Sequence, residues 1–217
     1  MKNIIFSIVE NTIFSSLVFS YLIFKAKIQK RFIYTDNILI IALSTSIGYC
    51  VYNLLSVNNI TLIVLINPFL TIFLIGCLTL FHFYRNPERH HNAEKNDILS
   101  PADGFIVYIK RIEEGKTPFS VKGRTISKLQ ELTKVDILQS PCWLIGIVMT
   151  LFDVHVNRAP TSGRVVLNKY FKGKFVSLKN GESEVKNERN TIVLKNELYQ
   201  IGVIQIASKR VRGIESY

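Results

Sequence analysis

Three long apolar segments near the start of the chain restrict its fold more than any other feature of the sequence. They cover residues 4–24, 38–55 and 60–81, which is 21, 18 and 22 residues, and Glu10 is the one charged side chain among them. A helix needs roughly 20 apolar residues to cross a hydrocarbon core about 30 Å thick. The sequence therefore predicts about three transmembrane helices within a membrane region that covers residues 1–84.

The first apolar segment allows a second interpretation, because cleaved signal peptides also place an apolar run near the N-terminus. Its length exceeds a typical signal-peptide core, and Lys25 and Lys27 follow it in place of a small-residue cleavage site. Glu10 argues the other way, since a carboxylate inside a bilayer is costly. The sequence alone therefore leaves open whether this segment spans the membrane.

Charge is distributed unequally along the chain. There are 27 basic and 16 acidic residues, a net charge of +11, and only seven of these charges lie in residues 1–84. The Ser56–Asn59 connection has no basic side chain. Basic side chains gather instead after the first and third predicted spans: Lys25, Lys27, Lys30, Arg31, Arg85 and Arg89. Because basic residues are enriched in cytoplasmic loops, the pattern predicts that residues 85–217 lie on the cytoplasmic side of the membrane. The excess of positive charge favours an anionic partner such as nucleic acid, a phospholipid headgroup or an acidic metabolite.

Residues 85–217 have the pattern of a β-rich domain. Short apolar runs alternate with Pro and Gly breaks, and the runs cover residues 105–112, 143–151, 164–170, 191–194 and 199–207. Runs of this length between such breaks are typical of strands. Asn180-Gly181 predicts a hairpin turn, and residues 126–138 have weak helical spacing. The predicted fold is N-terminal transmembrane helices followed by a β-rich (α+β) domain.

Metal, disulfide and nucleic acid chemistry receive little support. Cys50, Cys77 and Cys142 are odd in number and lack C-x-x-C spacing, which disfavours a disulfide or zinc framework. The adjacent His90 and His91 lie in a polar linker, where solvated side chains are the simpler interpretation, so no metal is predicted. The basic residues between 169 and 189 form no recognisable nucleic acid-binding module, so no nucleic acid partner is predicted.

Two short motifs carry residues suited to acid–base chemistry. Ser100-Pro101-Ala102-Asp103-Gly104 places a carboxylate in a predicted tight turn, although Asp and Gly are also common turn formers. The second motif, residues 153–160, follows a strongly apolar run. On an extended chain Asp153, His155 and Asn157 project from one face, because side chains alternate along a strand. An imidazole beside an orienting carboxylate suits general-base catalysis, and a water-facing histidine on an edge strand is the alternative.

In their order along the chain, the motifs resemble one protein family. The blocks are Phe83-Tyr84-Arg85-Asn86-Pro87-Glu88-Arg89, the Ser100–Gly104 turn, Asp153-Val154-His155-Val156-Asn157-Arg158-Ala159-Pro160, Gly173-Lys174-Phe175 and Asn187-Glu188-Arg189-Asn190. Together they resemble the short, membrane-bound bacterial form of phosphatidylserine decarboxylase. The resemblance implies a carboxy-lyase of phospholipid biosynthesis that converts phosphatidylserine to phosphatidylethanolamine and carbon dioxide. It also implies phosphatidylserine and anionic membrane lipids as partners, and the bacterial inner membrane as the location.

The resemblance further implies a proenzyme that cleaves its own backbone at a Gly-Ser bond and converts the serine to a pyruvoyl group. Decarboxylation beside an amine leaves a carbanion, and the pyruvoyl carbonyl accepts those electrons as a Schiff base, without pyridoxal phosphate or a metal. By matching motif, His155 takes the serine hydroxyl proton, and Asp103 orients the imidazole or stabilises its charged form. Asp153 is a supporting candidate next to His155.

The sequence departs from the family pattern at one point, because its 217 residues contain no Gly-Ser dipeptide. The family motif is expected some tens of residues after Ile204-Gln205-Ile206-Ala207, and Ser208 and Ser216 lack its context. This chain alone is therefore expected to be inactive. Three explanations stay open: a truncated or frame-shifted gene product or partial chain, whose domain is incomplete at its C-terminus, a large subunit with a separate small pyruvoyl subunit, or a lipid-binding pseudoenzyme. A membrane-anchored scaffold domain of other ancestry is the alternative outside the family.

Overall fold

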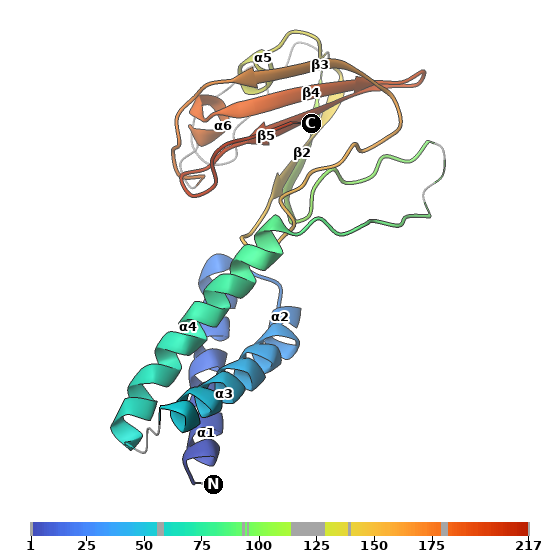
Figure 1. Cartoon of the computed structure of the whole chain (residues 1–217). Coiled ribbons are helices and arrows are strands. Elements are labelled where there is room, and N and C mark those ends of the chain that lie inside the picture. The colour runs from blue at the N-terminus through green and yellow to red at the C-terminus, as the bar shows by residue number, and fades with distance from the viewer. Residues whose placement is uncertain are drawn as a thin grey trace. The chain divides into compact units, whose positions relative to one another are not determined.

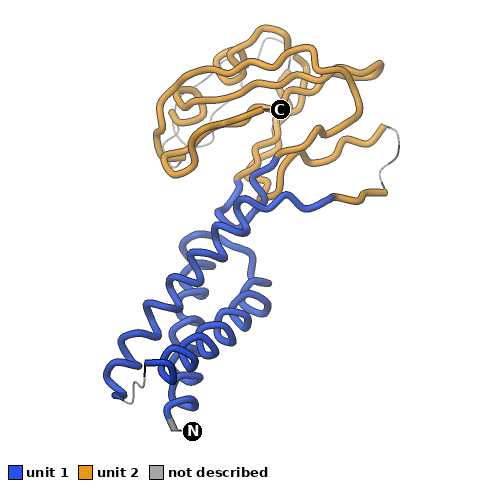
Figure 2. The backbone as a smooth tube through the Cα atoms, in the orientation of Figure 1, with its two compact units in different colours: residues 1–88, 149–156 blue, residues 89–148, 157–217 orange. Residues whose placement is uncertain are grey.

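The computed structural model describes residues 2–55, 59–92, 94, 96–113, 129–138, 140–178 and 182–216. The chain divides into two compact units, coloured separately in Figure 2. Unit 1 consists of Met1–Glu88 and Met149–Val156, and unit 2 of Arg89–Val148 and Asn157–Tyr217. Unit 1 therefore includes a short segment that is distant in sequence from its helices, and each unit is described by itself.

Unit 1 is built mainly from helices. They are α1 (Lys2–Tyr21), the π-helical turn η1 (Leu22–Ala26), α2 (Arg31–Tyr34), α3 (Asp36–Leu54) and α4 (Ile60–Tyr84) (Figure 1). Three helical stretches, Asn3–Ala26, Arg31–Leu54 and Ile60–Tyr84, are long and apolar enough to cross a membrane. The three predicted apolar helices are confirmed. In the predicted Ser56–Asn59 connection, residues 56–58 lie outside the described residues, and the Asn59 side chain caps α4 by accepting a hydrogen bond from the Thr61 amide at 2.9 Å.

Polar and small side chains line the region where α1, α3 and α4 meet. Those that are buried are Ser7, Asn11, Ser15, Asn37, Ser44, Asn67 and Thr71. The members on α1 recur every four residues, so they share one face of the helix. Asn11 joins both other helices, because it donates to Thr45 Oγ1 at 3.1 Å and accepts from Thr71 Oγ1 at 3.3 Å. Small residues and interhelical hydrogen bonds of this kind hold membrane helices together.

Glu10 has a hydrogen-bonding partner inside this bundle. Asn67 donates to Glu10 Oε2 at 2.7 Å and to Ser7 Oγ at 3.2 Å, and its carbonyl oxygen accepts from the Tyr52 hydroxyl. A paired carboxylate in a helical bundle is less costly than one that faces lipid. The residue that argued against a first span is therefore accommodated by Asn67 of α4, which Tyr52 of α3 also contacts.

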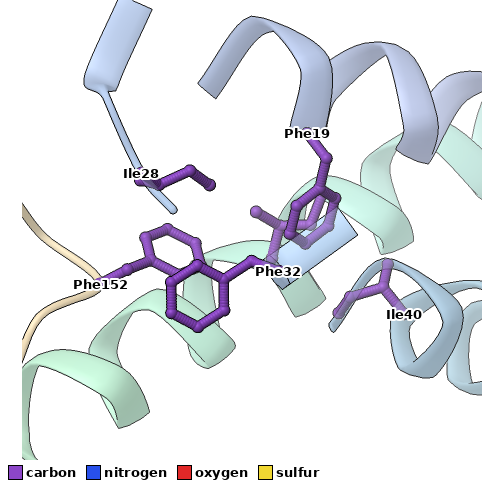
Figure 3. Close-up of a cluster of buried hydrophobic side chains, with 6 residues drawn as sticks. Phe19, Ile28, Phe32, Ile40 and Phe152 are labelled. Atoms are coloured by element: carbon purple, nitrogen blue, oxygen red, sulfur yellow. The ribbon is translucent and has the colours of Figure 1, made fainter. Parts of the chain in front are cut away.

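At the end of the bundle where α4 finishes, apolar side chains form a buried cluster. It contains Phe19, Ile28, Phe32, Ile40, Ile75 and Phe152 (Figure 3). Phe152 comes from the Met149–Val156 segment, and its ring lies 5.1 Å from that of Phe32 and 6.5 Å from that of Phe19, measured between centroids. This side chain fixes the segment to the helices of unit 1.

Within its described residues, unit 2 contains two antiparallel sheets. The first pairs β1 (Phe105–Ile112) with β2 (Cys142–Val148), and the second has the order β3 (Arg164–Phe171), β4 (Arg189–Lys195) and β5 (Gln200–Ile206). Two short helices, α5 (Leu129–Thr133) and α6 (Ser183–Lys186), accompany them. Strand β4 is central in its sheet, and because consecutive residues along it are buried, side chains on both of its faces are covered. The predicted succession of apolar helices and β-sheets is confirmed.

Three local predictions differ from the structure or fall outside it. The predicted strand 143–151 ends at Val148, and the residues after it turn rather than continue the ladder. The helical segment expected over 126–138 is described only as α5. The predicted Asn180-Gly181 hairpin lies outside the described residues.

Candidate active site

The Asp153 side chain closes a turn that follows β2. Its Oδ2 accepts hydrogen bonds from the Thr150 amide at 2.7 Å and from the Thr150 hydroxyl at 2.8 Å, and its own amide donates to the Thr150 carbonyl at 3.0 Å. The prediction that Asp153, His155 and Asn157 line one face of a strand is therefore wrong. An aspartate that binds nearby backbone competes with the strand ladder for those groups. Asp153 is 2% exposed, and the turn places it and His155 in unit 1, whereas Asn157 begins the next segment of unit 2.

The imidazole of His155 has a defined orientation. Its Nδ1 lies 2.9 Å from the backbone carbonyl oxygen of Asp153. Because a carbonyl oxygen can only accept, this hydrogen bond requires the proton on Nδ1. In the neutral ring Nε2 is then the nitrogen with a free lone pair, which is the atom that a general base uses.

An aromatic ring from α4 covers the His155 imidazole. The ring of Phe83 stacks on it with centroids 3.9 Å apart and an interplanar angle of 25°. Burial lowers the pKa of His155 below 6.5, and the hydrogen bond and charge of Asp153 offset part of that effect. The imidazole is therefore mainly neutral near pH 7, as a base must be before it accepts a proton.

Asp103 lies in the turn that precedes β1, in unit 2. Its Oδ2 is 2.6 Å from Nη2 of Arg89, and both side chains are partly exposed. The turn requires Gly104, which has a φ of +133° and whose Cβ, if present, would lie 2.4 Å from the Val148 carbonyl oxygen. The local sequence thus sets the carboxylate at the start of a strand, next to a guanidinium group.

Hydrogen bonds join this turn to the second half of the other predicted motif. The Pro101 carbonyl accepts from the Arg158 amide at 2.9 Å and from Asn157 Nδ2 at 3.3 Å. Asn157 Oδ1 in turn accepts from Gln205 Nε2, on β5, at 2.8 Å. Unit 2 therefore brings together the Asp103 turn, Asn157 and β5. Asp153 and His155 belong to unit 1.

The Asn187–Asn190 motif forms a buried polar support where β4 of the second sheet begins. Asn187 Nδ2 donates to the carbonyls of Val176 and Ala207, each at 2.8 Å. Arg189, which is fully buried, donates to the carbonyls of Asn187 and Leu132, and burial lowers its pKa to about 10. Gly173 is required beside this motif, because a Cβ there would lie 2.4 Å from the Glu188 amide nitrogen. These buried hydrogen bonds stabilise the fold of unit 2.

Sequence reasoning assigned no role to Phe83, Arg89 or Gln205, although each lies in or beside a quoted motif. Their contacts join segments that are 14 to 72 positions apart, and neither periodicity nor spacing reveals such pairs. Among the described residues, no group of three or more His, Cys, Asp or Glu side chains could hold a metal ion.

Comparison with known proteins identifies the family. The family model for phosphatidylserine decarboxylase matches residues 78–217. A protein from Methanocaldococcus jannaschii, named as an archaetidylserine decarboxylase proenzyme, is 40% identical over 126 residues, which are 58% of this chain and 59% of that protein. Phosphatidylserine decarboxylase proenzymes from Carboxydothermus hydrogenoformans and Geotalea uraniireducens are 36% and 32% identical over 68% and 67% of this chain, and over 60% and 59% of their own lengths.

The chain thus spans about three fifths of the length of the curated relatives it matches. The matched region begins within α4 and includes the Asp103 turn, the His155 segment and the buried Asn187–Asn190 support. The chain belongs to the phosphatidylserine decarboxylase family.

Proposed function

We propose that this chain is the membrane-bound, His155- and Asp103-bearing part of a serine-phospholipid decarboxylase proenzyme. The observation that carries the proposal is the state of His155. Its Nδ1 proton is committed to the Asp153 carbonyl, its Nε2 is the basic atom, and burial keeps the ring neutral near pH 7. Relatives named as decarboxylase proenzymes support the assignment.

The chain's own residues supply acid–base chemistry to a serine that is presented to them. Nε2 of His155 takes the hydroxyl proton, and the imidazolium that forms is stabilised by the Asp153 carbonyl and by the nearby Asp153 carboxylate. Such general-base assistance is typically worth about 100- to 10,000-fold in rate. Asp103 is proposed to act with His155 as the second member of the acid–base pair.

The reactive serine is not among these 217 residues, which contain no Gly-Ser dipeptide. We propose that a Gly-Ser segment acts on this site either as a continuation of the chain or as a separate small subunit. The pyruvoyl group made from such a serine would supply the electron sink for decarboxylation. Among the described residues, His155 fits the role of the base that would help to form the pyruvoyl group. The serine that would become this group is not among them.

The test is self-cleavage of the chain after a Gly-Ser segment from a relative has been joined to its C-terminus. The fused chain should split into two fragments, and His155→Ala should slow this cleavage by at least about 100-fold, the lower range of general-base effects. His91→Ala, at an exposed histidine, is the matched control and should cleave normally. Cleavage of His155→Ala at the normal rate would refute the proposed base. Absence of cleavage in every form, together with retained binding to phosphatidylserine vesicles, would favour the pseudoenzyme or scaffold alternative.

We propose a lipid with a serine headgroup as the substrate, since the names of the relatives include both phosphatidylserine and archaetidylserine decarboxylases. The processed protein should release labelled carbon dioxide from carboxyl-labelled phosphatidylserine or archaetidylserine. The ratio of kcat/KM for the two lipids would establish which lipid backbone is preferred. The unmodified 217-residue chain should release none from either lipid.

We propose that unit 2 faces the cytoplasm. The proposal is supported by the basic residues after α1, by Arg85 after α4, and by the apolar helices that suggest membrane association. Reporter fusions at Lys30 and at the C-terminus should both report a cytoplasmic position. An external signal from the C-terminal fusion would overturn this topology.

A further inference from the structure

Phe83 joins the end of an apolar membrane helix to the candidate base. It is the penultimate residue of α4, and its half-buried ring stacks on His155 with centroids 3.9 Å apart. The edge of Tyr84 supports the same ring, with centroids 4.9 Å apart and planes inclined by 71°. The imidazole therefore packs against a ring that is itself held at the helix terminus.

The backbone that carries His155 is fixed to the same helix end. Phe152 lies in the apolar cluster of the bundle, and its carbonyl oxygen accepts a hydrogen bond from Nη2 of Arg85 at 3.4 Å. Val154, the neighbour of His155, is 1% exposed. Because two buried side chains fix the segment, the remaining freedom of His155 is rotation of its ring.

That rotation decides which nitrogen is available. A half-turn of the imidazole exchanges Nδ1 with a carbon atom, which removes the hydrogen bond to the Asp153 carbonyl and frees the ring to carry its proton on either nitrogen. A flat ring stacked at 3.9 Å opposes the half-turn, because the imidazole has to leave the stack to complete it.

Resting on the proposed role of His155 as the base, we propose that Phe83 is a positioning residue that fixes the orientation of the His155 ring. In this orientation Nδ1 donates to the Asp153 carbonyl and Nε2 is the basic atom. Phe83 acts through His155 and does not itself take part in proton transfer. Charged groups near the segment include the Asp153 carboxylate within it, the Arg85 guanidinium after α4, and the Asp36 carboxylate, which pairs with His82 beside Phe152. A planar aromatic ring, rather than apolar bulk alone, is the property that the position requires.

The tautomer of His155 can be observed directly by nitrogen NMR. The full chain contains four histidines, so histidine-selective ¹⁵N labelling in lipid nanodiscs gives few signals, and His155→Gln identifies the one of interest. The wild type should show the Nδ1–H tautomer and an upfield ring-current shift of the imidazole protons. Phe83→Tyr, which keeps the flat ring, should retain both features. Phe83→Leu should lose the upfield shift and populate the Nε2–H tautomer.

The control substitution is Phe73→Leu, at an exposed phenylalanine of the same helix, which should leave the His155 signals unchanged. An Nε2–H tautomer in the wild type, or unchanged His155 signals in Phe83→Leu, would overturn the proposal. If Phe83→Leu does not fold, the wild type and Phe83→Tyr decide it, because both must show the Nδ1–H tautomer and the ring-current shift. These signals are independent of self-cleavage, so a His155 that has the expected tautomer but is dispensable for cleavage would refute the proposed function alone.

Discussion

The ring of Phe152 stacks on the imidazole of His82, with centroids 5.3 Å apart and planes inclined by 28°. Nε2 of the same imidazole lies 2.6 Å from the Asp36 carboxylate, so α3, α4 and the segment after β2 meet at one point. Phe152 is 2% exposed and lies one residue before the turn-forming Asp153. The segment that carries the candidate base is therefore held by the packing of membrane-type helices.

Phe152→Ala should destabilise unit 1 strongly. Removing a buried phenylalanine side chain typically costs about 3–5 kcal/mol, because it loses apolar contacts and leaves a cavity. Thermal unfolding in detergent micelles should show a lower midpoint than for Phe69→Ala, a control at an exposed position of α4. Equal midpoints for the two variants would show that the cluster around Phe152 contributes little.

The coarse fold could be read from the sequence because its signals are local. Apolar length identifies a membrane-type helix, and alternating short runs with Gly and Pro breaks identify strands. The packing of Met149–Val156 against helices that precede it by more than 60 residues could not be read this way, because it depends on long-range contacts. The predicted strand 143–151 failed for a related reason, since the apolar residues Leu151 and Phe152 pack against the helices instead of extending β2.

Asn67 should matter more to the helical bundle than Glu10 does. Asn67 is fully buried and bonds to Ser7, Glu10 and Tyr52, so Asn67→Ala removes contacts to two other helices. Interhelical hydrogen bonds in membrane proteins contribute about 0.6–2 kcal/mol each. Glu10→Gln keeps an oxygen acceptor for Asn67 and should have a smaller effect.

The resistance of the bundle to unfolding by increasing amounts of sodium dodecyl sulfate would measure this difference. Asn53→Ala, at an exposed position of α3, serves as the control and should behave like the wild type. If Glu10→Gln unfolds at a lower detergent concentration than Asn67→Ala, the carboxylate charge of Glu10, rather than the amide of Asn67, holds the helical bundle together.

The candidate site was less predictable than the fold. Motif identity singled out Asp103, Asp153 and His155, but the alternation argument failed because the Asp153 side chain bonds to Thr150 and turns the chain. The tautomer of His155 depends on a backbone carbonyl, and its cover depends on Phe83, 72 positions earlier. Side-chain orientation and long-range stacking are properties of the folded chain, so no spacing rule could supply them.

His155 should make the folded chain less stable as the pH falls below neutrality. Its pKa is lowered by burial in the folded state, so the unfolded chain binds the proton more readily. Stability linked to this group is complete above an unfolded-state pKa of about 6.5 and is lost as the pH falls toward the lower folded-state pKa. Between about pH 7.5 and pH 5.5, the thermal midpoint of the wild type should fall more than that of His155→Gln. A control substitution, His91→Gln at an exposed histidine, should follow the wild type, and equal slopes for wild type and His155→Gln would contradict the shift.

Asp103→Asn should separate chemistry from stability. The ion pair with Arg89 joins side chains that are 33% and 46% exposed, and exposed pairs contribute at most about 1 kcal/mol. Asparagine also suits the turn, so the thermal midpoint should change little. Self-cleavage of the chain with an added Gly-Ser segment should nevertheless slow, because the variant lacks the carboxylate charge proposed to act with His155. Arg89→Gln removes the same ion pair but keeps that carboxylate, and it should slow cleavage less. If Arg89→Gln and Asp103→Asn slow cleavage equally, the ion pair rather than the carboxylate supports the reaction. An Asp103→Asn variant that cleaves at the normal rate would remove Asp103 from the proposed acid–base pair.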